Sequence, residues 1–211
     1  MKVWDGYIRF FHWALVSCLV GLYFSAEEGA LELHFVLGYI TLALLATRLI
    51  WGLVGSDTAR LSALFHGPKA VVQALQAKHL TPGHNAAGSY MVLVFFALIL
   101  LQLATGLMTT DDIMVDGPLV QYVSYDWVEW ASSLHHQNFD WLLIAIGLHL
   151  VAIVVYALRG KKLVPAMVTG RNKQVSTAAQ LKASWPAFAL FAVLLGVLLT
   201  TWGYEPLQTL L

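Results

Sequence analysis

Charged residues are scarce in this chain of 211 residues. Only 11% of them are Asp, Glu, Lys or Arg, whereas 59% are hydrophobic, and the mean hydropathy is +0.70. A soluble globular domain carries roughly 25% charged residues, because they cover its hydrated surface. A chain with fewer than half that share is not a soluble enzyme, a nucleic-acid-binding protein or a disordered segment. The composition indicates an integral membrane protein.

Cysteine is nearly absent as well. The single Cys18 lies inside an apolar run, which excludes a disulfide framework and a cysteine metal cluster. No Cys-x-x-Cys-His motif occurs, so the usual attachment motif for a covalently bound c-type haem is missing.

Long apolar runs are what the chain has instead. A helix crosses the bilayer core with about 20 mostly apolar residues, and five stretches meet that criterion: 9–25, 33–54, 86–108, 135–158 and 185–202. The sequence therefore predicts an all-α membrane helix bundle. We also expect a short amphipathic helix over 68–79 on the inner surface and an outer interfacial segment with aromatic anchors over 113–131.

The charges are distributed very unevenly along the chain. If the N-terminus is inside, all twelve basic residues belong to inner segments or to the inner end of a span. The outer segments carry Asp and Glu but no Lys or Arg. Because basic loops stay on the cytoplasmic side, we predict five spans, a cytoplasmic N-terminus and a periplasmic C-terminus.

Histidine is abundant, with eight residues, although a polar side chain at membrane depth is costly without a partner. Four lie in spans or at their ends: His12, His34, His135 and His149. His135 and His149 are 14 residues apart, about 40° short of four turns and roughly 21 Å of rise, so they share a helix face. His136 would point about 140° away from His149.

Depth sorts these four histidines into two pairs. His34 and His135 each open a span on the outer side, whereas His12 and His149 lie toward the inner side. Each pair can supply both axial ligands of a haem, giving two stacked haems. A proton relay and a transition-metal site remain alternatives. The spans lack the carboxylates that a zinc or manganese pathway usually adds, since Asp140 is the only acid well within a span.

Two glycines and two arginines accompany the pairs. Gly38 lies one turn after His34 and Gly147 lies near His149, where a bare backbone admits a flat macrocycle or allows ordinary helix packing. Arg48 lies deep on the inner side, where its guanidinium suits a haem propionate or reaches the inner headgroups. The same two interpretations apply to Arg9.

Two further histidines adjoin the expected sites. We expect His84 to approach the inner haem or a quinone headgroup, or to act only as a polar residue where the third span begins. His136 either hydrogen-bonds beside His135 or replaces it as a ligand.

Four motifs in order resemble the prokaryotic cytochrome b561 family, which includes the b-type cytochrome subunits of nickel–iron hydrogenases. They are RFFHW at 9–13, HFVLG at 34–38, HNAAG at 84–88 and the spacing of His135 and His149. The family often has proline where Ala86 stands. The resemblance covers roughly residues 4–160.

This resemblance implies a four-helix core with two b haems, each between two histidines. His12 and His149 would bind the inner haem, and His34 and His135 the outer one. We divide the chain into a di-haem cytochrome b domain over 1–160 and a basic inner loop with an extra transmembrane helix over 161–211.

The leading hypothesis is a cytochrome of the bacterial inner membrane. It would pass electrons between the quinone pool and a periplasmic partner, such as a cytochrome c or an oxidoreductase subunit. An electron carrier is favoured over a catalyst, because bis-histidine ligation leaves iron no open position. One alternative is a superoxide:quinone oxidoreductase, and one of another class is a metal-ion transporter or membrane anchor. The oligomeric state, a homodimer included, is left open.

Overall fold

The computed structural model describes residues 1–76, 82–113 and 115–211, and the regular structure in them is helical. Four helices are long and apolar enough to cross a membrane: α1 (Gly6–Glu27), α2 (Leu31–Val54), α4 (Ala86–Gly106) and α5 (Tyr125–Leu158). α7 (Trp185–Thr201) and α8 (Tyr204–Leu210) meet at 84° and qualify as a fifth span only if they are taken together. The prediction of an all-α membrane helix bundle is confirmed.

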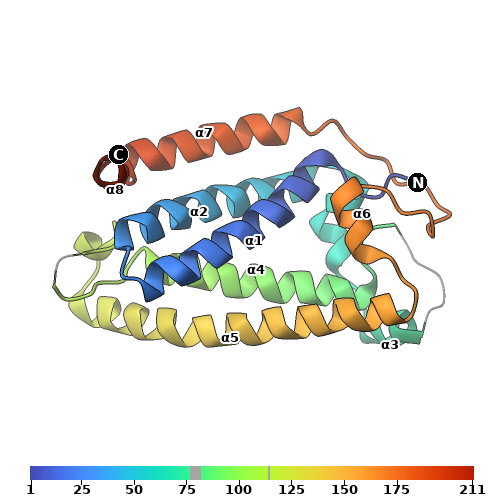
Figure 1. Cartoon of the computed structure of the whole chain (residues 1–211), viewed down its shortest axis with the longest axis horizontal. Helices are drawn as coiled ribbons and strands as arrows, with labels where there is room; N and C mark the ends of the chain where they lie inside the picture. The colour runs from blue at the N-terminus through green and yellow to red at the C-terminus, as the bar shows by residue number, and fades with distance from the viewer. Residues whose placement is uncertain (77–81, 114) are drawn as a thin grey trace.

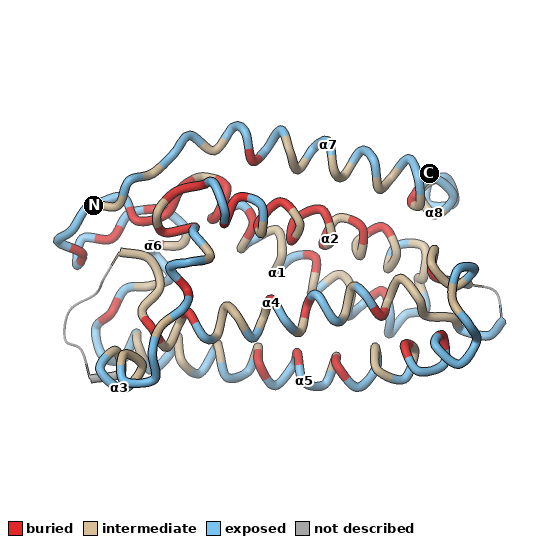
Figure 2. The backbone as a smooth tube through the Cα atoms, turned by 180° about the vertical axis from the view of Figure 1, so that it is seen from behind, coloured by how far each residue is buried: buried red, intermediate tan, exposed pale blue. Residues whose placement is uncertain are grey.

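The long helices pack as two pairs. α1 lies along α2, and α4 lies along α5. The two pairs contact each other mainly through α2 and α4. α7 packs on α2, on the side away from α5 (Figure 1). Figure 2 shows that α2 is the most buried of these helices, while α5 and α7 leave much of their length exposed. The exposed side chains of α5 are largely apolar, as a lipid-facing surface requires.

The two ends of the bundle differ in charge. The N-terminus, α3 (Pro68–Gln76) and α6 (Leu163–Thr169) lie at one end, where the basic segments gather, and α8 lies at the acidic end (Figure 1). The short helices η1 (Asp57–Ala59) and η2 (Leu61–Leu64) belong to the basic segments, and η3 (Val120–Tyr122) to the acidic ones. The expected amphipathic helix over 68–79 is found as far as Gln76, and residues 77–79 lie outside the described residues.

The fourth span begins ten residues earlier than predicted. α5 starts at Tyr125 instead of residue 135, so residues 125–131 of the expected interfacial loop over 113–131 are helical and belong to α5. A search for apolar runs detects only the part of a helix that lies in the hydrocarbon core of the membrane. Asp126 in the first turn favours the helix N-terminus, and the helix therefore continues upstream of the apolar run. At about 1.5 Å per residue α5 is longer than the roughly 30 Å hydrocarbon core.

The first residues of the chain are bonded to the segment after α6. The Met1 ammonium donates to the Asn172 carbonyl at 2.7 Å, and the Val3 N–H donates to the Gly170 carbonyl at 2.8 Å. Gly170 ends α6 with a φ of +74°, a conformation that favours glycine. Segments more than 160 residues apart in the sequence are thus joined at the basic end.

Asp5 connects the start of α1 to the end of α2. Its Oδ1 accepts the N–H of Ile8 at 2.9 Å and its Oδ2 accepts the Nε1–H of Trp51 at 3.0 Å. Asp5 is only 5% exposed, so both bonds are shielded from water and each donor would be left buried without it.

We expect Asp5→Ala to destabilise the protein by about 1–3 kcal/mol, because it removes a helix cap and leaves the indole N–H unpaired. Thermal unfolding in detergent, followed by circular dichroism, measures the change. The exposed Asp116 provides the control, and Asp116→Ala should leave the midpoint unaltered. Equal midpoints for the two variants would contradict the proposed coupling.

Candidate functional site

His34 and His135 face one another inside the bundle. The ring centroids are 6.4 Å apart, with an interplanar angle of 72°. His34 lies in the first turn of α2 and His135 lies in α5. An imidazole-to-metal bond is about 2.0 Å long, so two rings bound on opposite sides of one metal ion have centroids roughly 6–6.5 Å apart. The observed spacing fits one iron held between the two rings.

The Nδ1 atom of each ring is already engaged. The partners are a backbone carbonyl and a hydroxyl in each case: Leu22 O at 3.0 Å and Ser25 Oγ at 3.3 Å for His34, and Gln102 O at 3.0 Å and Thr105 Oγ1 at 3.2 Å for His135. A carbonyl only accepts, so we assign the proton to Nδ1 in both rings. Each Nε2 then keeps a free lone pair, which is the arrangement that metal-binding histidines use.

α4 supports His135 in two ways. A Cβ atom on Gly106 would lie 2.8 Å from Cε1 of His135, so only glycine lets the ring pack this closely on the helix end. The carbonyl of His135 accepts a bond from Nε2 of Gln102 at 3.0 Å. Asn138, 1% exposed, donates to Gln102 Oε1 at 2.6 Å and to the Leu98 carbonyl at 2.9 Å. These bonds hold the backbone of α5 at His135 against α4.

This supporting network was not predicted from the sequence. A signal was present, because Gln102 and Thr105 lie one turn apart within an otherwise apolar span, and Asn138 lies one turn after His135. Polar side chains at that spacing occupy one helix face. Their partners lie on the neighbouring helix, which a single-chain pattern does not reveal.

His136 does not share this position. Its side chain is exposed, and its ring centroid lies 6.3 Å from that of His135. Of the two neighbours, the structure places His135 opposite His34, as the helical geometry predicts.

His12 and His149 lie within electrostatic range of each other, but their rings are less constrained. Within the described part of the chain no hydrogen bond joins either ring to another residue, and the buried Nδ1 of His12 has no partner. The His12 ring packs edge-on against Trp13 at 4.9 Å, and the His149 ring against Phe95 at 5.7 Å. Each of the two rings is thus held by packing against its own aromatic neighbour.

Two polar side chains without partners adjoin the inner pair. Arg48 is 3% exposed, its guanidinium lies 5.4 Å from the Phe96 ring centroid, and its Nη1 finds no acceptor among the described residues. His84 packs against Trp4 at 4.7 Å, and its buried Nδ1 is unpaired too. Burial lowers the pKa of His84 to about 3, so the ring is neutral. A buried guanidinium without an acceptor is costly, and a carboxylate ligand would remove that cost.

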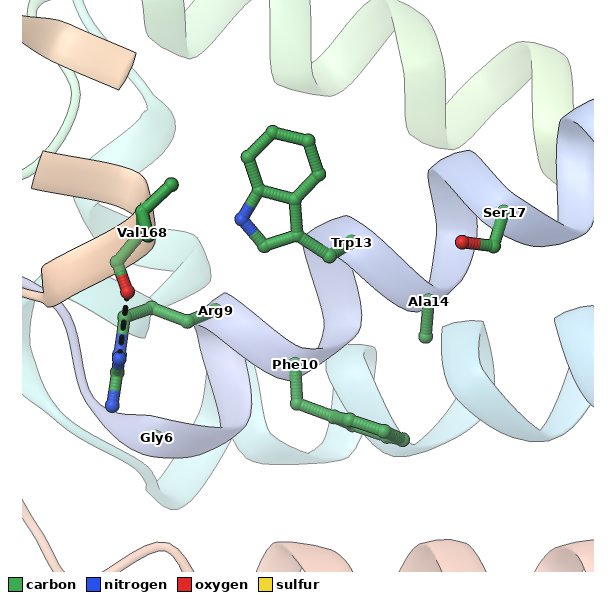
Figure 3. A pocket seen from close by; sticks show the side chains of 7 residues that line it. All are labelled: Gly6, Arg9, Phe10, Trp13, Ala14, Ser17 and Val168. Carbon is green, nitrogen blue, oxygen red and sulfur yellow. Dashed lines mark hydrogen bonds between the residues drawn. The ribbon is translucent and has the colours of Figure 1, made fainter. Parts of the chain in front are cut away.

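Arg9 points elsewhere. Its Nη1 donates to the Val168 carbonyl at 2.9 Å, near the C-terminal end of α6 (Figure 3). Together with Phe10 and Trp13 it lines a surface depression of about 440 Å³ beside that helix. A contact with a haem propionate stays a prediction for this residue.

The glycines predicted to admit a macrocycle face open space. A Cβ atom added to Gly38 or Gly147 would meet nothing within 4 Å. Among the described residues, no group of three or more His, Cys, Asp or Glu side chains could hold a metal ion. A haem needs only two protein ligands, and the residues present fit one.

Two imidazoles with free Nε2 atoms, facing one another inside an apolar helix bundle, have the chemistry of the axial ligands of a b-type haem. The model of the prokaryotic cytochrome b561 family matches residues 3–170. The chain belongs to this family, as its motifs predicted, and is a membrane b-type cytochrome of electron transfer. No curated protein and no solved structure gave a significant match.

Proposed function

We propose that the protein holds two b haems and passes electrons between membrane quinone and a redox partner on the outer side. His34 and His135 would hold the outer haem, and His12 and His149 the inner one. The single observation that carries the proposal is the facing of His34 and His135 at 6.4 Å with both Nδ1 atoms hydrogen-bonded.

Haem supplies one-electron oxidation and reduction of its iron. The chain would supply the rest. Nε2 lone pairs of the four histidines would ligate the iron, and Arg48 would bind a propionate of the inner haem through bidentate hydrogen bonds. The apolar helices would keep water from the site, which strengthens these electrostatic contacts.

The charge of the two ends supports an orientation and a type of partner. We place the basic end and the N-terminus in the cytoplasm of a bacterium, and the acidic end and the C-terminus in the periplasm. The acidic end would then attract a partner with a basic face, such as a cytochrome c or an oxidoreductase subunit.

Haem counting tests the ligand assignment. We expect two haems per chain in a pyridine haemochrome assay of the purified protein, and one in each of His12→Ala and His34→Ala, because each variant lacks one axial ligand. His66→Ala serves as the matched control and should keep two haems, since among the described residues the hydrogen bond at His66 is made by its backbone carbonyl, with Tyr90. A wild-type protein with one haem, or a His34→Ala variant with two, would refute the assignment.

Anaerobic addition of a short-chain quinol tests the quinone separately. The b-type absorption bands should develop if quinol donates electrons to the haems. Bands that develop with dithionite but not with quinol would remove quinone from the proposal and leave the haem sites intact.

A further inference from the structure

The two histidine pairs differ in how their rings are held. Both rings of the outer pair donate from Nδ1 to a backbone carbonyl and approach a hydroxyl, whereas neither ring of the inner pair has a hydrogen-bonded partner in the described ranges. A hydrogen bond accepted from Nδ1–H makes the imidazole a more basic ligand. A more basic ligand stabilises the oxidised, more positively charged iron and lowers its reduction potential.

The hydroxyls of the outer site are oriented for this role. Ser25 Oγ donates to the Leu22 carbonyl at 3.2 Å, and Thr105 Oγ1 donates to the Leu101 carbonyl at 2.7 Å. Since the proton of each hydroxyl is used on the backbone, its oxygen lone pairs remain for the Nδ1–H of His34 or His135. Both hydroxyls therefore act as acceptors toward the ligand rings.

The inner site has the opposite electrostatic surroundings. The buried guanidinium of Arg48 has no ion pair in the described part of the chain. Asp5 lies within its electrostatic range, and its carboxylate keeps its negative charge while it accepts hydrogen bonds from Ile8 and Trp51. Asp5 therefore offsets part of the Arg48 charge, and the rest acts on the inner site. Tyr7 and His84 are further titratable neighbours of Arg48, and neither a phenol nor an imidazole is an anion at neutral pH. A buried cation favours the reduced iron, because reduction removes one positive charge from its vicinity. With a propionate bound to it, Arg48 would still act in this direction, because it would neutralise an anion beside the iron.

We infer that the outer haem has the lower reduction potential, set by Ser25 and Thr105, and that the inner haem has the higher one, set by Arg48. An electron shared between the two sites then resides mostly at the inner, basic end. This inference rests on the proposed two-haem function and adds the residues that tune each site.

Redox potentiometry of the purified protein, followed in the b-type absorption bands, tests the inference. We expect two separate potentials. The double variant Ser25→Ala/Thr105→Val should shift the lower one upward and leave the higher one in place. Arg48→Gln should shift the higher one downward, and Arg48→Lys, which keeps the cation, should restore much of it.

Arg60→Gln is the matched control, because Arg60 is a half-exposed arginine of the same end that pairs with Asp57 at 3.7 Å. It should move neither potential. A double variant that shifts the higher potential, or an Arg48→Gln variant that shifts the lower one, would overturn the inference. So would one common potential for both haems. Haem counts on the same samples distinguish two outcomes. A lost haem tests the proposed function, whereas a haem that is present with a changed reduction potential tests this inference.

Discussion

His135→Ala is expected to lower the haem content of the purified protein from two per chain to one, whereas His136→Ala should retain both. The ring of His135 lies opposite His34 with its Nδ1 held by the Gln102 carbonyl, and the side chain of His136 is exposed. His135→Ala would delete a ligand of the proposed outer haem, whereas His136→Ala would delete only the exposed residue next to that ligand. The pyridine haemochrome assay measures the difference.

The adjacent variants form a matched pair, since both remove an imidazole from the same turn of α5. If His136→Ala lost a haem and His135→Ala kept two, the register of α5 relative to α2 would be wrong. The absorption spectrum of the remaining haem should match that of His34→Ala, because both variants empty the same site.

Gly106→Ala should weaken the outer haem site although it removes no ligand. The new Cβ would lie 2.8 Å from Cε1 and 3.2 Å from Nδ1 of His135, so the ring must move and lose its aligned hydrogen bonds. Changes to groups that orient a metal-binding histidine typically cost roughly 10- to 100-fold in affinity. Haem transfer to apomyoglobin, followed by absorption, measures the faster loss.

Gly196→Ala is the control, because a Cβ atom at that position of α7 meets nothing within 4 Å. It should release haem at the wild-type rate. Equal release rates in the two variants would show that His135 tolerates the displacement. Loss of both haems in Gly106→Ala would instead point to general unfolding.

Much of the bundle was predictable because it follows from two properties of the sequence itself, the length of its apolar runs and the helical spacing of its polar residues. The apolar runs locate α1, α2 and α4 to within a few residues, since crossing the bilayer imposes a length. The spacing of His135 and His149 assigns them to one helix face without knowledge of any neighbouring helix. That His34 and His135 face each other also follows from the sequence, because each lies at the outer end of its span and both are therefore at the same depth in the membrane.

The remaining features depend on contacts between helices. Nothing in the segment around Arg9 indicates that α6 will present the Val168 carbonyl to it. The partners of Asn138 lie on α4, 36 and 40 residues away in the sequence. The start of α5 was misplaced for a different reason, because an amphipathic helical turn with Trp127 and Trp130 has the composition of an interfacial loop.

The bonded ammonium of Met1 has a practical consequence for purification. An affinity tag fused at that end would replace the charged amine and place a flexible chain where the first residues meet Gly170 and Asn172. The opposite end offers a better attachment point, because Leu211 is fully exposed beyond α8. Protein tagged after Leu211 is therefore better suited to spectroscopy, whereas a tag before Met1 would disturb the hydrogen bonds to Asn172 and Gly170 in every variant.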